Sequence, residues 1–218
     1  MPHRFQCGLE IDATRFQATL NTSDAPHPAL LNSIYALACH FSLSPILAQH
    51  ESRFVNRTLR SISTALEKSD RLLHVLQGSC LLAIFFFIKG RLLEGYYHAG
   101  SAVRLAVGLG LHQVSAPTFL SDVVCSQSQQ AVGSVVSTPI LPPATNPVEF
   151  GERVLTFWQV YCLDRCWAVA TGLPVALSED SHPRTRIETV WPCSLEEYEM
   201  VSYYISYPNL NINHLVAY

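Results

Sequence analysis

The chain has 218 residues, of which 49% are hydrophobic and 14% are charged, and its formal net charge is −3. About a quarter of the residues in a soluble domain are usually charged. This composition therefore predicts apolar surface that is covered by a partner, or a chain that is part of a larger protein. The basic residues are scattered and are outnumbered by acidic ones, which excludes the clustered positive charge of a protein that binds DNA directly.

The seven cysteines are an odd number, and most lie in apolar segments that no secretory signal precedes. We therefore expect reduced thiols in a cytosolic or nuclear protein. The apolar run Cys80–Ile88 is too short to span a bilayer and is followed by Lys89 and Arg91. It predicts a buried core helix and no membrane partner.

The N-terminal half predicts three helices after an extension. Residues 1–25 lack a sustained period, apart from a weak strand pattern at Cys7–Ile11. Pro26 and Pro28 then open a first helix, because proline fits the first helical turn. Apolar residues follow at three- and four-residue steps and give this helix one apolar face: Leu30, Leu31, Ile34, Leu37, Ala38 and Phe41.

Ser44–Pro45 predicts the start of a second helix that reaches about Glu67. We expect its apolar residues to point inward: Ile46, Leu47, Phe54, Val55, Leu59, Ile62 and Leu66. The charges on its other face, which we interpret as a solvated surface rather than a binding site, are Glu51, Arg53, Arg57 and Arg60.

The third and fourth helices are expected to form the centre of the domain. Ser69–Asp70 predicts the cap of a helix over Arg71–Ile88, which is apolar nearly all round at its C-terminal end. The stretch Gly90–Gln113 then reads as one helix with small residues at close spacing, which lets a neighbouring helix approach. Its five glycines cost roughly 0.5–1 kcal/mol each, so we expect tight packing or a helix break to compensate.

Residues 115–147 are rich in Ser, Gln, Val and Pro and predict a disordered linker. A fifth helix is expected over Val148–Ala170, ended by Gly172 and Pro174, and a short final helix starts at Ser194. The predicted fold class is all-α, a multi-helix bundle or array of about six helices with a long disordered linker. Its parts are an extension (1–25), a helical domain (26–192) that contains the linker, and a tail (193–218).

Two charged residues in apolar helices suggest a structural contact. Arg104 is flanked by apolar residues on the fourth helix, and Asp164 lies within the fifth. A buried charge needs a partner, so we expect an ion pair between them that joins the two helices. Arg165 and Glu152 are the alternative partners.

No pattern indicates a catalytic, cofactor or metal site. Cys162 and Cys166 share a helix face, but no second pair has ligand spacing. His98 and His112 lie too far apart on one helix to share a ligand, so packed or capping roles are favoured. Sequence patterns of hydrolases, metalloproteases and phosphate-binding loops are absent from the chain.

Four blocks of this sequence resemble a known family. They are His27–Ser42 (HPALLNSIYALACHFS), Tyr96–His112 (YYHAGSAVRLAVGLGLH), Glu152–Pro174 (ERVLTFWQVYCLDRCWAVATGLP) and Ile187–Pro192 (IETVWP). They resemble, in order, the regulatory middle homology region of fungal zinc-cluster transcription factors, also called the xylanolytic-activator regulatory domain. The motif residues that carry the resemblance are Arg104, Gly110, His112, Trp158, Asp164, Arg165, Gly172 and Pro174.

The resemblance implies an all-helical regulatory region of a nuclear transcription factor, which follows a DNA-binding zinc cluster in the sequence. No two cysteines here are closer than four apart, so this chain cannot hold that cluster. We therefore expect a truncated product without a cofactor of its own, in which zinc and DNA belong to a missing module. The expected partners are other segments of the factor, co-regulators and a small-molecule effector held between the fourth and fifth helices.

Two other functions stay open at this point. One is a helical protein-interaction scaffold without a role in transcription. The other is a small-molecule enzyme built on helices, which the missing nucleophile, base and metal patterns disfavour. We expect regulation rather than catalysis.

Overall fold

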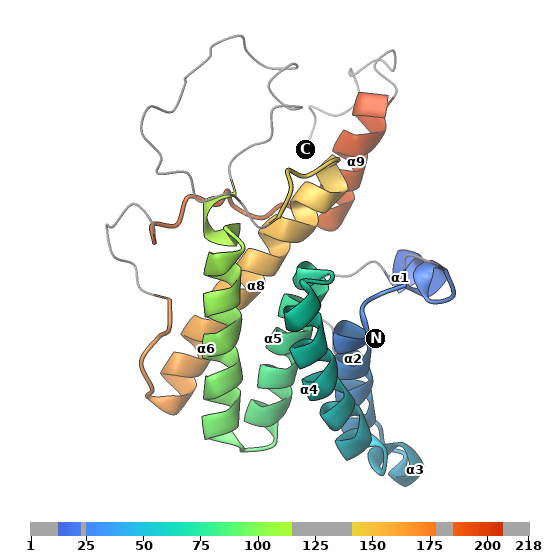
Figure 1. Cartoon of the computed structure of the whole chain (residues 1–218), viewed down its shortest axis with the longest axis vertical. Helices are drawn as coiled ribbons and strands as arrows, with labels where there is room; N and C mark the ends of the chain where they lie inside the picture. Colours follow the sequence, from blue (N-terminus) through green and yellow to red (C-terminus); the bar gives the residue numbers. More distant parts are fainter. Residues whose placement is uncertain (1–12, 23–24, 115–140, 178–184, 207–218) are drawn as a thin grey trace.

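The computed structural model describes residues 13–22, 25–114, 141–177 and 185–206. These residues form α-helices and one 3₁₀ turn, and no strand occurs among them. Figure 1 shows α2, α4, α5 and α6 running side by side, with α8 crossing α6 obliquely. The predicted all-α array is thus confirmed. Within the described ranges, no helix is long and apolar enough to cross a membrane.

Helix α5 (Leu72–Ile88) is the centre of the array and packs on α2 (Pro28–His40), α4 (Glu51–Lys68), α6 (Leu92–Gly108) and α8 (Pro147–Thr171). Nearly all of its side chains are buried, from Leu72 to Phe87. This follows from its sequence, because a helix that is apolar on every side has no face suited to water.

The backbones of α2 and α5 lie close together at Gly78. A Cβ atom built on Gly78 would lie 2.8 Å from the carbonyl oxygen of Ala29 and 3.1 Å from the amide nitrogen of Leu30. Real Cβ atoms essentially never come that close to backbone. The glycine therefore permits this crossing.

Helix α6 ends earlier than the sequence predicts. Gly90 and Gly110 have φ values of +71° and +75°, and they lie outside α6 rather than within one long helix. The chain turns at Gly110 into a short 3₁₀ helix, η2 (Leu111–Gln113). Because glycine adopts positive φ without steric cost, the expected helix break falls at these two residues. Within α6, the place of a Cβ on Gly95 is taken by the Phe87 ring.

Helix α8 has the termini that the sequence suggests. The Asn146 side chain accepts a hydrogen bond from the Glu149 amide at 2.9 Å, and Pro147 is the first helical residue. Gly172 ends the helix in the left-handed conformation, with φ +69°. Residues 141–146 of the expected linker are described and lead into this cap, whereas 115–140 lie outside the described residues.

The last helix, α9 (Leu195–Ser206), is longer and better anchored than the expected tail. Ser194 and Glu197 cap it reciprocally, through hydrogen bonds of 3.2 and 2.7 Å. Tyr198 packs over Gly151 and lies edge-on to Phe150, with ring centroids 6.0 Å apart. Residues 195–206 thus extend the array alongside α8.

The N-terminal expectations need three corrections. Helix α1 (Ala13–Thr19) forms within the expected extension, and Cys7–Ile11 lies outside the described residues. The second expected helix is two helices, α3 (Pro45–Ala48) and α4, so the register of α3 does not continue in α4. Ile46 and Leu47 are consequently 69% and 48% exposed rather than inward. Leu66, near the end of α4, is also exposed.

Candidate functional site

The expected Arg104–Asp164 ion pair does not form. Arg104 is exposed to solvent on α6, whereas Asp164 is buried on α8. Both oxygens of the Asp164 carboxylate accept backbone hydrogen bonds instead, from Ala176 at 2.8 Å and from Leu177 at 3.0 Å. The premise was wrong, because a cation flanked by apolar residues in sequence still points outward if it occupies the outer helix face.

Asp164 and its neighbour hold the chain that leaves α8. Arg165 donates to the Leu177 carbonyl at 2.8 Å, so Leu177 is bound at both its amide and its carbonyl group. Gly172 turns the chain back, and the exposed Pro174 follows in the same loop. We call Asp164, Arg165 and residues 172–177 the Asp164 clamp. The clamp lays Ala176 against Gly100 of α6, 3.9 Å from the position of a Cβ there.

A second return segment, residues 185–191, crosses η2; we call it the strap. The backbone carbonyl of His112 accepts hydrogen bonds from Glu188 at 2.8 Å and Thr189 at 3.2 Å. The Thr189 hydroxyl donates to the Leu111 carbonyl at 2.5 Å and accepts from the Val114 amide at 3.1 Å. After the turn at Gly110, the carbonyl groups of Leu111 and His112 and the amide of Val114 thus find their hydrogen-bond partners in the strap.

Trp158 of α8 fixes the end of the strap. Its indole nitrogen donates to the Val190 carbonyl at 2.7 Å, and its ring stacks on Trp191 with centroids 4.5 Å apart. The indole N–H of a packed tryptophan usually finds such a partner. Trp158 thus links α8 to the same strap that satisfies η2.

Apart from Arg104, the motif residues belong either to the strap or to the clamp, and they do not form a single ion pair. Gly110, His112 and Trp158 belong with the strap, and Asp164, Arg165, Gly172 and Pro174 belong to the clamp. Sequence reasoning missed Thr189, Ala176 and Leu177 as contacts. Their contribution is largely through backbone groups, which leave no pattern of side chains to detect.

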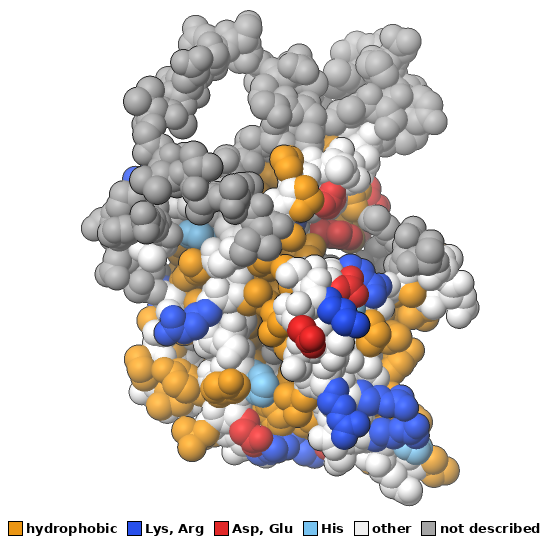
Figure 2. Space-filling model, in the orientation of Figure 1, with side chains coloured by type: hydrophobic (Ala, Val, Ile, Leu, Met, Phe, Trp, Pro, Cys, Tyr) orange, Lys and Arg blue, Asp and Glu red, His pale blue; other side chains and the backbone are white. Residues whose placement is uncertain are grey.

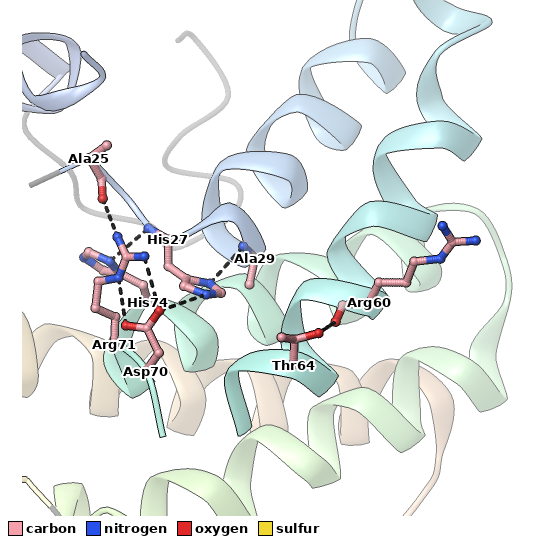
Figure 3. A network of polar contacts seen from close by, with 8 residues as sticks. All are labelled: Ala25, His27, Ala29, Arg60, Thr64, Asp70, Arg71 and His74. Atoms are coloured by element: carbon pink, nitrogen blue, oxygen red, sulfur yellow. Dashed lines mark hydrogen bonds and ion pairs between the residues drawn. The ribbon is translucent and has the colours of Figure 1, made fainter. Parts of the chain in front are cut away.

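A polar network anchors the start of α2 (Figure 3). The Arg71 guanidinium donates to the Ala25 carbonyl at 2.7 Å and lies against Asp70, with a shortest hydrogen bond of 3.1 Å. His27 caps α2 by accepting from the Ala29 amide at 3.1 Å. Its own amide donates to Nδ1 of His74 at 3.3 Å. Asp70 therefore pairs with Arg71 instead of capping α5, which corrects the expected cap.

The two histidines of this network are held neutral. Burial is the main cause that lowers the pKa of His74, to about 4, and Arg71 adds to it while Asp70 opposes. Burial also lowers the pKa of His27, assisted by Arg71. Since Nδ1 of His74 accepts a backbone hydrogen bond, a proton there would remove that bond.

We expect acid to weaken the fold through His74. The unfolded chain takes up a proton near pH 6.5, but the folded chain does so near pH 4, so the free energy of unfolding falls as the pH drops between these values. The full loss is about 3 kcal/mol. Urea unfolding at pH 7, 5 and 4 measures it. His74→Gln should flatten part of the pH dependence, and an unchanged slope in that variant would contradict the assignment; His50→Gln, on an exposed residue, is the control.

No group of three or more His, Cys, Asp or Glu residues within the described ranges lies close enough to hold a metal ion. Cys162 and Cys166 are exposed free thiols on α8. Cys80 is fully buried, and burial raises its pKa to about 12, so it stays a thiol.

Comparison with known proteins identifies the family of the chain. A search of curated proteins and a search of solved structures found no match. The family model of the fungal specific transcription factor domain matches residues 5–212, which includes the helices, the clamp and the strap described above. The chain therefore belongs to the fungal specific transcription factor domain family.

Proposed function

We propose that this chain is a regulatory module of a nuclear transcription factor and that it acts by binding protein segments rather than by catalysis. Membership of the family carries the proposal, since the family is one of regulatory domains in fungal transcription factors. DNA binding and zinc belong, in this proposal, to another module of such a factor.

The clamp and the strap support regulation through a change in how the helices pack. The clamp is hydrogen-bonded to α8 and lies against α6 at Gly100, and the strap is hydrogen-bonded both to Trp158 of α8 and to η2, which follows α6. A change in the position of either segment would therefore alter how α8 sits on α6. In the proposal, a partner or a small-molecule effector acts by favouring one such arrangement.

The proposal is tested by fusing residues 1–218 to a foreign DNA-binding module and measuring transcription of a reporter gene in yeast. We expect the fusion to change reporter output relative to the DNA-binding module alone. Asp164→Ala should abolish that change at equal protein level, because it releases the clamp. Arg104→Ala should leave it intact, since Arg104 is exposed.

The same assay separates the alternatives. A reporter output that equals that of the DNA-binding module alone, with the fusion present in the nucleus and folded, would contradict a regulatory role and favour a scaffold without a role in transcription. Immunoblotting and circular dichroism of the purified fusion supply the two controls.

A further inference from the structure

Helix α4 carries three arginines on one exposed face. Arg53, Arg57 and Arg60 follow one another at four- and three-residue steps, which places them on one side of a helix over about 10 Å. All three are exposed, and within the described ranges none of their guanidinium groups has an ion-pair partner. Figure 3 shows the side chain of Arg60 extending away from α4.

Four other arginines are neutralised locally, and the exposed Arg104 stands alone on α6, so the group of three on α4 is distinct. Arg71, Arg91, Arg153 and Arg186 each lie against a carboxylate that is close in sequence. The acidic residues of α4 do not form ion pairs with the three arginines of that helix. Glu51 is engaged by Lys89 at 2.9 Å and His40 at 3.2 Å, and Glu67 lies two turns beyond Arg60.

Apolar side chains adjoin the arginines. Leu43, Ile46 and Leu47 belong to α3 and the residue stretch before it, and they are 102%, 69% and 48% exposed. Figure 2 shows Lys and Arg side chains gathered over the end of α4 nearest to α3, beside hydrophobic and histidine side chains. Exposed aliphatic residues that lie together commonly mark a site of interaction, and the positive charge beside them favours an acidic partner.

We propose that this surface, Arg53, Arg57 and Arg60 with Leu43, Ile46 and Leu47, binds an acidic amphipathic protein segment. Carboxylates of the partner pair with the guanidinium groups, which suit bidentate contact, and its apolar side chains cover α3. The inference rests on the proposed function, for which it names the chemistry of the partner. Its test measures binding in solution and needs no transcription, so the two can fail separately.

A nucleic acid is the less favoured occupant. Three cations contact few phosphates, and the chain as a whole carries a net charge of −3. The apolar neighbours Leu43, Ile46 and Leu47 are aliphatic, whereas proteins that bind single strands stack bases on aromatic side chains. Charge complementarity combined with aliphatic surface therefore favours a protein segment.

Binding of labelled probes to the full 218-residue chain tests the proposal. The main probe is a fluorescent peptide in which Asp and Glu alternate with Leu and Phe at helical spacing. A second peptide has Ser in place of Leu and Phe, and a third probe is a DNA duplex. Fluorescence anisotropy measures each dissociation constant, and circular dichroism checks that every variant keeps its helices.

We expect the acidic Leu/Phe peptide to bind best. The triple variant R53Q/R57Q/R60Q should weaken it about tenfold. The charge-matched control R91Q/R104Q/R186Q, on other faces of the molecule, should change it less than about twofold. I46S/L47S should weaken the Leu/Phe peptide and leave the Ser peptide unchanged.

Three results would overturn the proposal. The first is equal weakening by both triple variants, which would reduce the effect to net charge. The second is no preference for the Leu/Phe peptide over the Ser peptide. The third is tighter binding of the DNA duplex that depends on the same three arginines, which would assign the surface to nucleic acid.

Discussion

Asp164→Ala should cost about 3 kcal/mol of unfolding free energy, one of the two largest effects we expect from a single substitution. The buried carboxylate accepts two backbone hydrogen bonds, at 2.8 and 3.0 Å, and its removal leaves both amides without that acceptor. Hydrogen bonds to a charged group contribute about 1.5–3 kcal/mol each, and a buried donor left unpaired adds a desolvation cost. Chemical denaturation of the purified chain measures the loss.

Two controls make this result specific to the clamp. Asp164→Asn keeps one carbonyl acceptor and should cost roughly half as much as the alanine variant. Arg104→Ala should cost less than about 0.5 kcal/mol, because its side chain is exposed and has no ion-pair partner in the described part of the chain. If Arg104→Ala were as costly as Asp164→Ala, the two residues would act as a pair after all and the clamp would lose its support.

Much of the helical plan could be predicted from local chemistry. Pro28, Asn146 and Gly172 mark helix ends, because a missing N–H, a short side-chain acceptor and a positive φ each act within one turn. The nearly continuous apolar sequence of α5 likewise predicts that this helix lies at the centre of the array. The short α3 and the missed α1 show the limit of this reasoning, since periodicity over so few residues is weak.

The contacts between elements could not be predicted in the same way. An aspartate within an apolar helix indicates that a partner exists, but backbone amides are partners that every segment of the chain offers. Asp164 therefore points to Ala176 and Leu177 only after the turn at Gly172 has brought them back. The resemblance to a family named these residues from the sequence, whereas their contact partners depend on the three-dimensional fold.

Gly78→Ala should destabilise the chain by about 1–2 kcal/mol net, although alanine is the better helix former. The new methyl group would lie 2.8 Å from the carbonyl oxygen of Ala29, which is backbone and cannot rotate away. Forcing an extra methyl into a packed crossing costs about 1–3 kcal/mol, more than the 0.5–1 kcal/mol that a helix gains when alanine replaces glycine. Thermal and urea unfolding measure the net effect.

Gly100→Ala is the matched control for this prediction. Gly100 lies in the middle of α6, and a Cβ there would meet Ala176 at an ordinary 3.9 Å, so this variant should be stabilised by about 0.5 kcal/mol. Both substitutions raise helix propensity, but we expect their changes in unfolding free energy to have opposite signs. The difference therefore reports the packing of α2 on α5. Equal stabilisation by both substitutions would show that α2 can move off α5 at little cost. The network of His27 and His74, which lies one turn before Gly78, would then not fix the start of α2.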